Sequence, residues 1–144
     1  MKNALLVTTA LLLNYSANAY ANECGIPYKE ANISIIADTL ASKVMGKHLI
    51  DFEKPTPIKN RKMPWTLSEQ EDVREFIEDI LRKNNKATRD GQTKLAIESK
   101  ELASDRIGWW EDTTGTYVVY NPNEQECGTA FRPPSGKEYY DNET

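Results

Sequence analysis

The stretch that decides the fold is residues 68–81, with the sequence SEQEDVREFIEDIL. Its apolar side chains recur at the spacing of one helix face, and they are Val73, Phe76, Ile77, Ile80 and Leu81. Ser68 and Glu71 have the spacing of a capping box, which marks the start of a helix, and Asn84 and Asn85 mark its end. The pattern predicts an amphipathic helix that buries one face against another layer.

Residues 33–45 carry the same period upstream. Their apolar side chains form one stripe, made up of Ile33, Ile36, Ala37, Leu40, Ala41 and Val44. Asn32 is a favourable residue to cap the start of such a helix, and Gly46 suits the left-handed residue that follows a helix end. We therefore expect a second amphipathic helix here.

Short strands are expected around the two helices. Residues 48–52 predict one strand after the first helix, and residues 58–63 predict a second strand beside it. Downstream, residues 86–88 and 93–98 flank Asp90-Gly91, a pair that favours a tight β-turn, and so predict a hairpin. Each helix must bury its apolar stripe against such strands.

Aromatic and β-branched residues gather between positions 107 and 120. Trp109 and Trp110 precede a Gly-bearing turn at residues 112–115, and Tyr117 and Tyr120 follow it, which predicts a second hairpin. The four aromatic side chains either pack in the core or form an exposed patch that binds a partner. Both interpretations stay open, and the four residues are the candidate interaction site.

These elements predict an α+β protein, a small sandwich of two helices on a mixed sheet. We expect a signal peptide at residues 1–21 and the α+β domain at residues 22–100. The second hairpin, residues 101–121, is expected as an appendage. Residues 122–144 are expected to form a polar and mostly irregular tail, tethered at Cys127.

Length and composition place the chain among small proteins with a single folded domain. It has 144 residues, and 18 basic side chains stand against 22 acidic ones, a formal net charge of −4. This acidic balance argues against a nucleic-acid-binding module, which carries a basic face. A mean hydropathy of −0.65 excludes a membrane protein with several spans.

The first residues have the organisation of a secretory signal peptide. Lys2 supplies a positive charge, residues 4–13 form an apolar core, and a small-x-small pattern ends at Ala21. Cleavage after Ala21 is expected, with cleavage after Ala19 as the alternative. The apolar core is shorter than the roughly 20 residues that a spanning helix needs. We expect a periplasmic protein without membrane insertion after cleavage, with release outside the cell as the alternative.

Two cysteines, Cys24 and Cys127, lie near the two ends of the mature chain. An even cysteine count in an exported protein favours a disulfide. A bridge across about 100 residues stabilises a fold by up to about 4.7 kcal/mol in the chain-entropy model. Two thiols and a single histidine, in contrast, fall short of the ligands of a structural zinc site. No metal or cofactor is expected.

Side chains that could do chemistry are few. His48 is the single histidine, and we expect it at a strand edge or facing solvent rather than acting as a general base. Glu111 and Asp112 adjoin two tryptophans, and a carboxylate pair is the apparatus of glycoside hydrolysis, yet adjacent acids in a turn are usually solvated. The acidic residues within 68–81 form a wet helix face, with an acidic docking surface as the alternative. No motif of nucleophilic, zinc or phosphate chemistry is present, so we expect a protein that is not an enzyme.

The order and spacing of several segments match a family pattern. These segments are Ile33–Ala41, Gly46–Asp51, Pro57–Asn60, Leu67–Leu81 and Leu95–Ile97. Through them the chain from residue 32 to residue 98 resembles the small N-terminal N0 domain of secretins. It is also similar to the related short N-terminal domain of secretins and TonB-dependent receptors.

The resemblance implies a stand-alone periplasmic module of secretin type that is not itself a channel. It also implies a protein partner, a secretin or its inner-membrane component in a type II secretion or pilus assembly machine. The proline-rich link at residues 54–57, the aromatic hairpin and the cysteine pair depart from the family pattern. The alternatives are a secreted, disulfide-tied inhibitor or host-directed factor and, third, a cell-wall or sugar hydrolase.

Overall fold

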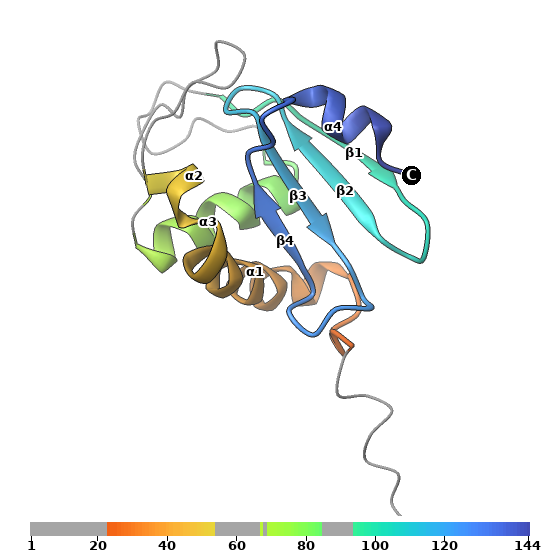
Figure 1. Cartoon of the computed structure of the whole chain (residues 1–144). Helices are drawn as coiled ribbons and strands as arrows, with labels where there is room; N and C mark the ends of the chain where they lie inside the picture. Colours follow the sequence, from red (N-terminus) through yellow and green to blue (C-terminus); the bar gives the residue numbers. More distant parts are fainter. Residues whose placement is uncertain (1–22, 54–66, 68, 85–93) are drawn as a thin grey trace, which may run out of the picture.

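The computed structural model describes residues 23–53, 67, 69–84 and 94–144 (Figure 1). Helices occupy the first half of this chain, and strands occupy most of the second half. The helical elements are η1 (Glu30–Asn32), α1 (Ile33–Lys47), α2 (Leu49–Glu53), α3 (Gln70–Leu81) and α4 (Lys137–Asn142). The strands are β1 (Ile97–Glu101), β2 (Ile107–Glu111), β3 (Thr116–Tyr120) and β4 (Gly128–Phe131).

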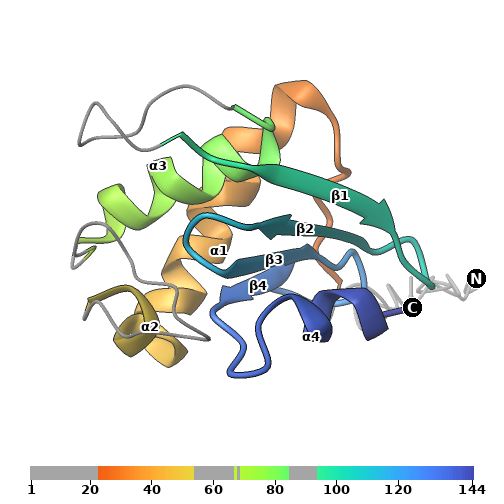
Figure 2. The ribbon, with the colours of Figure 1, turned by 90° about the horizontal axis from the view of Figure 1, so that it is seen from above.

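The described strands form one antiparallel sheet in the order β1-β2-β3-β4, so each strand pairs with its neighbour in the chain. Helices α1 and α3 pack against each other on one face of the sheet, and α4 lies on the opposite face (Figures 1 and 2). The α+β class is therefore confirmed. The sheet in the described part of the chain is antiparallel and not mixed, and helices α1 to α3 precede the strands instead of alternating with them.

Helix α1 confirms the helix expected at residues 33–45 and extends it to Lys47. All six residues of the predicted stripe are buried. Its two ends differ from the expectation. The helix is entered through the 3₁₀ turn η1, so the Asn32 side-chain amide donates to the Pro27 carbonyl oxygen (2.8 Å) instead of capping the helix. Gly46 lies inside the helix and does not have a left-handed backbone.

Helix α3 (Gln70–Leu81) confirms the amphipathic helix predicted at residues 68–81. Its five predicted core residues are all buried against α1 and the sheet. The capping box is not seen. Glu69 occupies the N-cap position without a side-chain cap, and the Glu71 carboxylate instead bonds the Arg74 guanidinium (2.7 Å). Ser68 lies outside the described residues.

The strand expected at residues 48–52 was wrong, because residues 49–53 form the short helix α2. The helix puts Phe52 into the core, where its ring meets that of Phe76 with centroids 6.3 Å apart. The Phe52 carbonyl oxygen accepts a hydrogen bond from the Leu67 N–H (2.8 Å). In a strand, Ile50 and its neighbours would point to alternate faces of a sheet. In α2 the Ile50 side chain is instead 64% exposed. The contact with Phe76 comes from a distant segment, so the local pattern could not reveal it.

Several other expectations fall outside the described residues. These are the signal peptide at residues 1–21, the strands at 58–63 and 86–88, and the turn at Asp90-Gly91. The strand expected at residues 93–98 overlaps β1 only at Ile97 and Glu98, because β1 runs from Ile97 to Glu101. Among the described helices, none combines the length and the apolar character that crossing a bilayer requires.

The second predicted hairpin is confirmed as β2 and β3, joined by a turn in which Gly115 has φ 74°. It is not an appendage, because β2 and β3 are the two central strands of the sheet. The aromatic residues of the hairpin supply core to both faces of that sheet.

The chain after residue 122 is also regular, contrary to the irregular tail that was expected. β4 pairs with β3, and α4 packs on the outer face of the sheet through buried Tyr140. Gly128 begins β4 with φ 122°, and a Cβ there would lie 1.9 Å from the Val119 carbonyl oxygen, so only glycine allows this approach. β4 buries the apolar side chain of Ala130, and α4 buries that of Tyr140. Neither element therefore shows the apolar periodicity that sequence analysis detects.

Candidate functional site

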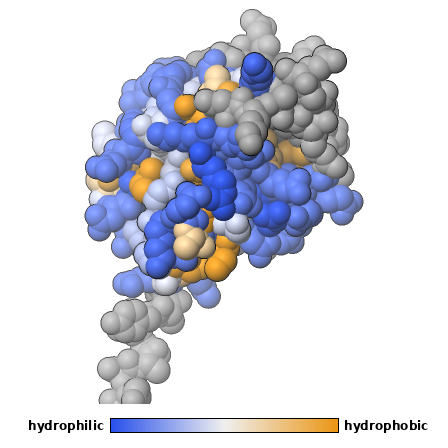
Figure 3. Space-filling model, turned by 180° about the vertical axis from the view of Figure 1, so that it is seen from behind, coloured by the Kyte–Doolittle hydropathy of each residue, from blue (hydrophilic) through white to orange (hydrophobic). Residues whose placement is uncertain are grey.

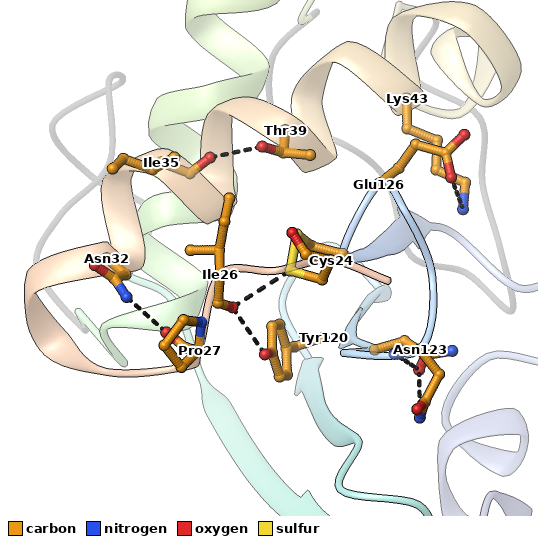
Figure 4. Close-up of a disulfide and its surroundings, with 12 residues drawn as sticks. Cys24, Ile26, Pro27, Asn32, Ile35, Thr39, Lys43, Tyr120, Asn123 and Glu126 are labelled. Carbon is orange, nitrogen blue, oxygen red and sulfur yellow. Dashed lines mark hydrogen bonds and ion pairs between the residues drawn. A yellow bond between two sulfur atoms is a disulfide. The ribbon is translucent and has the colours of Figure 1, made fainter. Parts of the chain in front are cut away.

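The predicted disulfide is present and joins Cys24 to Cys127 across 103 residues (Figure 4). It ties the segment before η1 to the loop between β3 and β4. The same segment is held without the bridge as well. The Cys24 N–H donates to the Pro122 carbonyl oxygen (3.0 Å), and the Tyr120 hydroxyl donates to the Ile26 carbonyl oxygen (2.9 Å). The N-terminal segment is therefore an integral part of the fold.

Beside the disulfide, α1 and the β3–β4 loop enclose an open surface groove of about 620 Å³. Its floor is the outer face of α1, formed by Asp38, Thr39, Ser42, Lys43, Gly46 and Lys47. Its far wall is the loop, through Gln125 and Glu126. We call this feature the α1 groove.

Ion pairs connect the β3–β4 loop, which forms the wall of the α1 groove, to α1, which forms its floor. Lys43 Nζ lies 2.8 Å from Glu124 Oε2. The same Nζ lies 4.0 Å from Glu126 Oε2, a pair that Figure 4 shows. Asn121 Nδ2 donates to the other Glu124 oxygen (3.0 Å). The hydrogen bond from Lys43 lowers the pKa of Glu124 below its ordinary value of 4.5, with burial opposing the shift. Together with the disulfide at Cys127 in the same loop, these contacts tie the β3–β4 loop to α1.

Gly46 is the residue of the α1 groove that the fold does not explain. A Cβ added to Gly46 would have no atom of the described residues within 4 Å, and its backbone is helical. Glycine inside a helix costs about 0.5–1 kcal/mol relative to alanine. Contacts among the described residues therefore do not require glycine here, and the missing side chain leaves the α1 backbone open to close approach at this point.

Glu111, which the sequence offered with Asp112 as a carboxylate pair for glycoside hydrolysis, is fully buried at the end of β2. Its Oε1 atom accepts from the N–H groups of Ala96 and Thr113, both at 2.9 Å. Its Oε2 atom accepts from the N–H and the hydroxyl of Thr114, at 2.7 and 2.5 Å. Both oxygens are thus committed to holding the β2–β3 turn and the start of β1. In this arrangement Glu111 is a structural residue.

Arg132, directly after β4, is buried near Glu111 and Thr114. Its Nε donates to the Thr114 carbonyl oxygen (2.9 Å), and its Nη1 donates to the Asp51 carbonyl oxygen (3.2 Å). Nη2 has no hydrogen-bond partner among the described residues. Burial lowers the pKa of Arg132, with Asp51 and Glu111 opposing the shift. Arg132 therefore links α2 to the β2–β3 turn.

The four aromatic residues of the candidate interaction site are all buried, each 4% exposed or less. Trp109 and Tyr120 pack under α1 and α3, whereas Trp110 and Tyr117 pack under α4. The Trp110 indole N–H also donates to Asp112 Oδ1 (3.1 Å). The structure does not bring the four together, and they do not form an exposed patch. Between the two interpretations of the sequence, core packing is the correct one.

His48 is the C-cap residue of α1 and not a strand residue. Its N–H donates to the Val44 carbonyl oxygen (2.8 Å), and its ring stacks on Phe131 with centroids 5.6 Å apart. Within the described segments, His, Cys, Asp and Glu side chains do not gather in groups of three or more that could hold a metal ion.

The acidic face of α3 is paired with arginines of the same helix. Arg74 bonds both Glu71 and Glu78, at 2.7 and 2.5 Å, and Arg82 lies 2.9 Å from Glu78. The hydrogen bond from Arg74 lowers the pKa of Glu71. The face is a network of alternating charges, so it is not a uniformly acidic docking surface.

Sequence reasoning missed the α1 groove. Lys43 reads as an ordinary polar position of an amphipathic helix, and its partner Glu124 lies 81 residues away. Nothing in the sequence pairs the two. Gly46 offered a signal, a glycine within the helical period, but a helix end explained it equally well.

Comparison with known proteins adds no relative. No protein-family model matches the chain, and neither does any curated protein or solved structure. The resemblance to secretin domains rests on the sequence pattern alone.

Proposed function

We propose that this protein is an exported docking module that is not an enzyme, and that the α1 groove receives a segment of a protein partner. The observation that carries the proposal is Gly46. It lines the α1 groove, and no packing contact among the described residues requires a glycine there. A bound segment that lies against α1 supplies a reason for the glycine.

The character of the α1 groove favours a protein over a small molecule. Small-molecule sites are deep and mostly apolar, with a few polar groups that orient the ligand. The α1 groove is open, and its lining carries charges of both signs from Asp38, Lys47 and Glu126. Mixed charge at a polar rim is typical of protein interfaces and gives them specificity.

The disulfide supports a role outside the cytoplasm. Structural disulfides persist in oxidising compartments such as the periplasm, and Cys127 belongs to the loop that walls the groove. The resemblance to secretin N0 domains makes a secretin, or its inner-membrane component, the proposed partner. The machine would be a secretion or pilus assembly apparatus.

The test is affinity capture from the periplasm with the exported, tagged protein and two variants. Gly46→Leu adds a side chain to the α1 groove at a site where an added Cβ meets no atom of the described residues. Glu75→Leu adds the same side chain to the exposed face of α3, where the Glu75 side chain is 58% exposed. The wild type and Glu75→Leu are expected to capture a secretin or its inner-membrane component, and Gly46→Leu is expected to lose it.

Capture of neither component, or equal capture by Gly46→Leu, would contradict the proposal. Recovery of an enzyme from outside the cell, lost with Gly46→Leu, would replace the secretin partner with the secreted-inhibitor function. That outcome would retain the groove as the docking surface.

A further inference from the structure

The outer edge of β1 has no strand partner among the described residues. β1 ends the strand order, and no other described strand pairs with its outer side. The Asp112 N–H bonds the Ala96 carbonyl oxygen, and the Leu102 N–H bonds the Arg106 carbonyl oxygen. Because bonded pairs alternate along an antiparallel ladder, even-numbered residues face β2 and odd-numbered residues face outward. Ile97, Ser99 and Glu101 therefore present three N–H groups and three carbonyl groups at the free edge.

We propose that a second copy of this chain pairs with β1 in antiparallel fashion about a two-fold axis at Ser99, joining the two sheets into one of eight strands. In this register Ile97 faces Glu101 of the second copy, and Ser99 faces Ser99. All of these residues have outward backbone groups, so each facing pair closes two hydrogen bonds. The interface is isologous and closes as a dimer.

The side chains of β1 favour this register over its neighbours. Glu98 of one copy faces Lys100 of the other, and the reverse pair forms at the symmetric position. Opposite charges directly across a ladder stabilise the pairing, and like charges destabilise it. A slip of two residues in either direction places Glu98 against Glu98 or Lys100 against Lys100. A slip of one residue places residues whose backbone N–H and carbonyl groups point outward opposite residues whose groups point to β2, so the hydrogen bonds cannot form. The segment is thus complementary to itself in one alignment.

The contacts of α4 pre-position both charges. Lys137 Nζ lies 2.8 Å from Glu98 Oε1, and Lys100 Nζ donates to the carbonyl oxygens of Asp141 and Glu143, at 3.3 and 2.6 Å. In the dimer each carboxylate of Glu98 lies between Lys137 of its own chain and Lys100 of the second copy. The proposal uses an edge of the sheet that does not line the α1 groove, so it stands independently of the proposed function.

Sedimentation equilibrium of the oxidised protein over a range of concentrations tests the proposal. The wild type is expected to dimerise. Ser99→Pro removes an outward N–H without touching the β1–β2 ladder, so this variant is expected to be folded and monomeric. Glu98→Lys and Lys100→Glu alone place like charges across the axis, and each is expected to be monomeric.

The decisive arm mixes the two charge variants. Glu98→Lys carries two lysines and Lys100→Glu carries two glutamates at the paired positions, so the mixture is expected to form a heterodimer. The double variant is expected to regain the homodimer. Lys29→Glu, a charge reversal outside β1 at the exposed start of η1, is the control and should dimerise. A monomeric wild type, a dimer that persists in Ser99→Pro, or a mixture without heterodimer would overturn the proposal.

Discussion

Removing the disulfide is the most informative single perturbation of this fold. The bridge joins positions 103 residues apart, close to the two ends of the described chain. Two forms remove it, the reduced wild type and the double variant Cys24→Ala/Cys127→Ala. Alanine is used because Cys127 is fully buried, where a serine hydroxyl would add a desolvation cost of its own.

The expected loss follows from the length of the closed loop. The chain-entropy model gives about 4.7 kcal/mol for a loop of this size at 25 °C. The contacts of the N-terminal segment, including the Cys24–Pro122 and Tyr120–Ile26 hydrogen bonds, act in the folded state and survive removal of the bridge. We expect a loss of about 3–5 kcal/mol in the free energy of unfolding, a large part of the roughly 5–15 kcal/mol of a typical domain.

Urea unfolding followed by tryptophan fluorescence measures this loss, since Trp109 and Trp110 are buried on opposite faces of the sheet. The reduced wild type and the double variant should agree with each other, and reductant should not affect the double variant. The dependence on urea should also steepen without the bridge, because the unfolded chain then exposes more surface. If removing the bridge lowered the free energy of unfolding by less than about 0.5 kcal/mol, the reasoning would be refuted. Such a result would mean that the bridge does not constrain the unfolded state.

Three further substitutions test individual contacts by the same unfolding assay. Glu111→Gln keeps the volume but sets an amide against backbone donors, and we expect a loss of about 2–3 kcal/mol, against less than 0.5 for Glu75→Gln on exposed α3; equal losses would contradict the buried role. Tyr117→Phe deletes a buried hydroxyl without a partner among the described residues, so stability should stay equal or rise by up to about 1 kcal/mol, and a clear loss would reveal a missing partner. Glu124→Gln breaks the pair with Lys43 and should cost about 0.5 kcal/mol at neutral pH, since the carboxylate is partly exposed. Because the pKa of Glu124 is lowered in the folded state, its contribution is full above the ordinary value of 4.5 and disappears as the pH falls through the folded value. The difference between wild type and variant should therefore vanish in acid, and a constant difference would argue against the ion pair.

The two long helices could be predicted from the sequence because their packing information is local. The stripe of α3 recurs every three or four residues, and a single face of a helix satisfies it whatever lies opposite. The hairpin of β2 and β3 was predictable for the same reason, since the turn residues and the aromatic alternation lie within 14 residues of one another.

The elements that sequence reasoning missed depend on contacts between distant segments. α2 is short, and its helical form rests on Phe52 entering the core beside Phe76. β4 and α4 bury one side chain each in the core, so they lack an apolar pattern and rely on pairing with β3 or on packing over the outer sheet face. Because the central position of the hairpin depends on β4, that position was missed as well.

The candidate site was even less accessible to sequence reasoning. The cysteine pair was found because cysteine count and export together favour a disulfide. The aromatic residues drew attention by composition, although burial is the commonest fate of such side chains. The α1 groove arises where a helix and a loop some 80 residues later meet, and only the fold brings Lys43 to Glu124.

The most direct test of the central claim, that the α1 groove docks a protein, is site-specific photocrosslinking in the cell that produces the protein. In one variant a photoreactive residue replaces exposed Lys47, which lines the α1 groove. In a second variant the photoreactive residue replaces exposed Glu75 on α3. We predict one defined crosslinked envelope protein from position 47, none from position 75, and loss of the product when Gly46→Leu is added. No product at position 47, or the same product from both positions, would contradict the account.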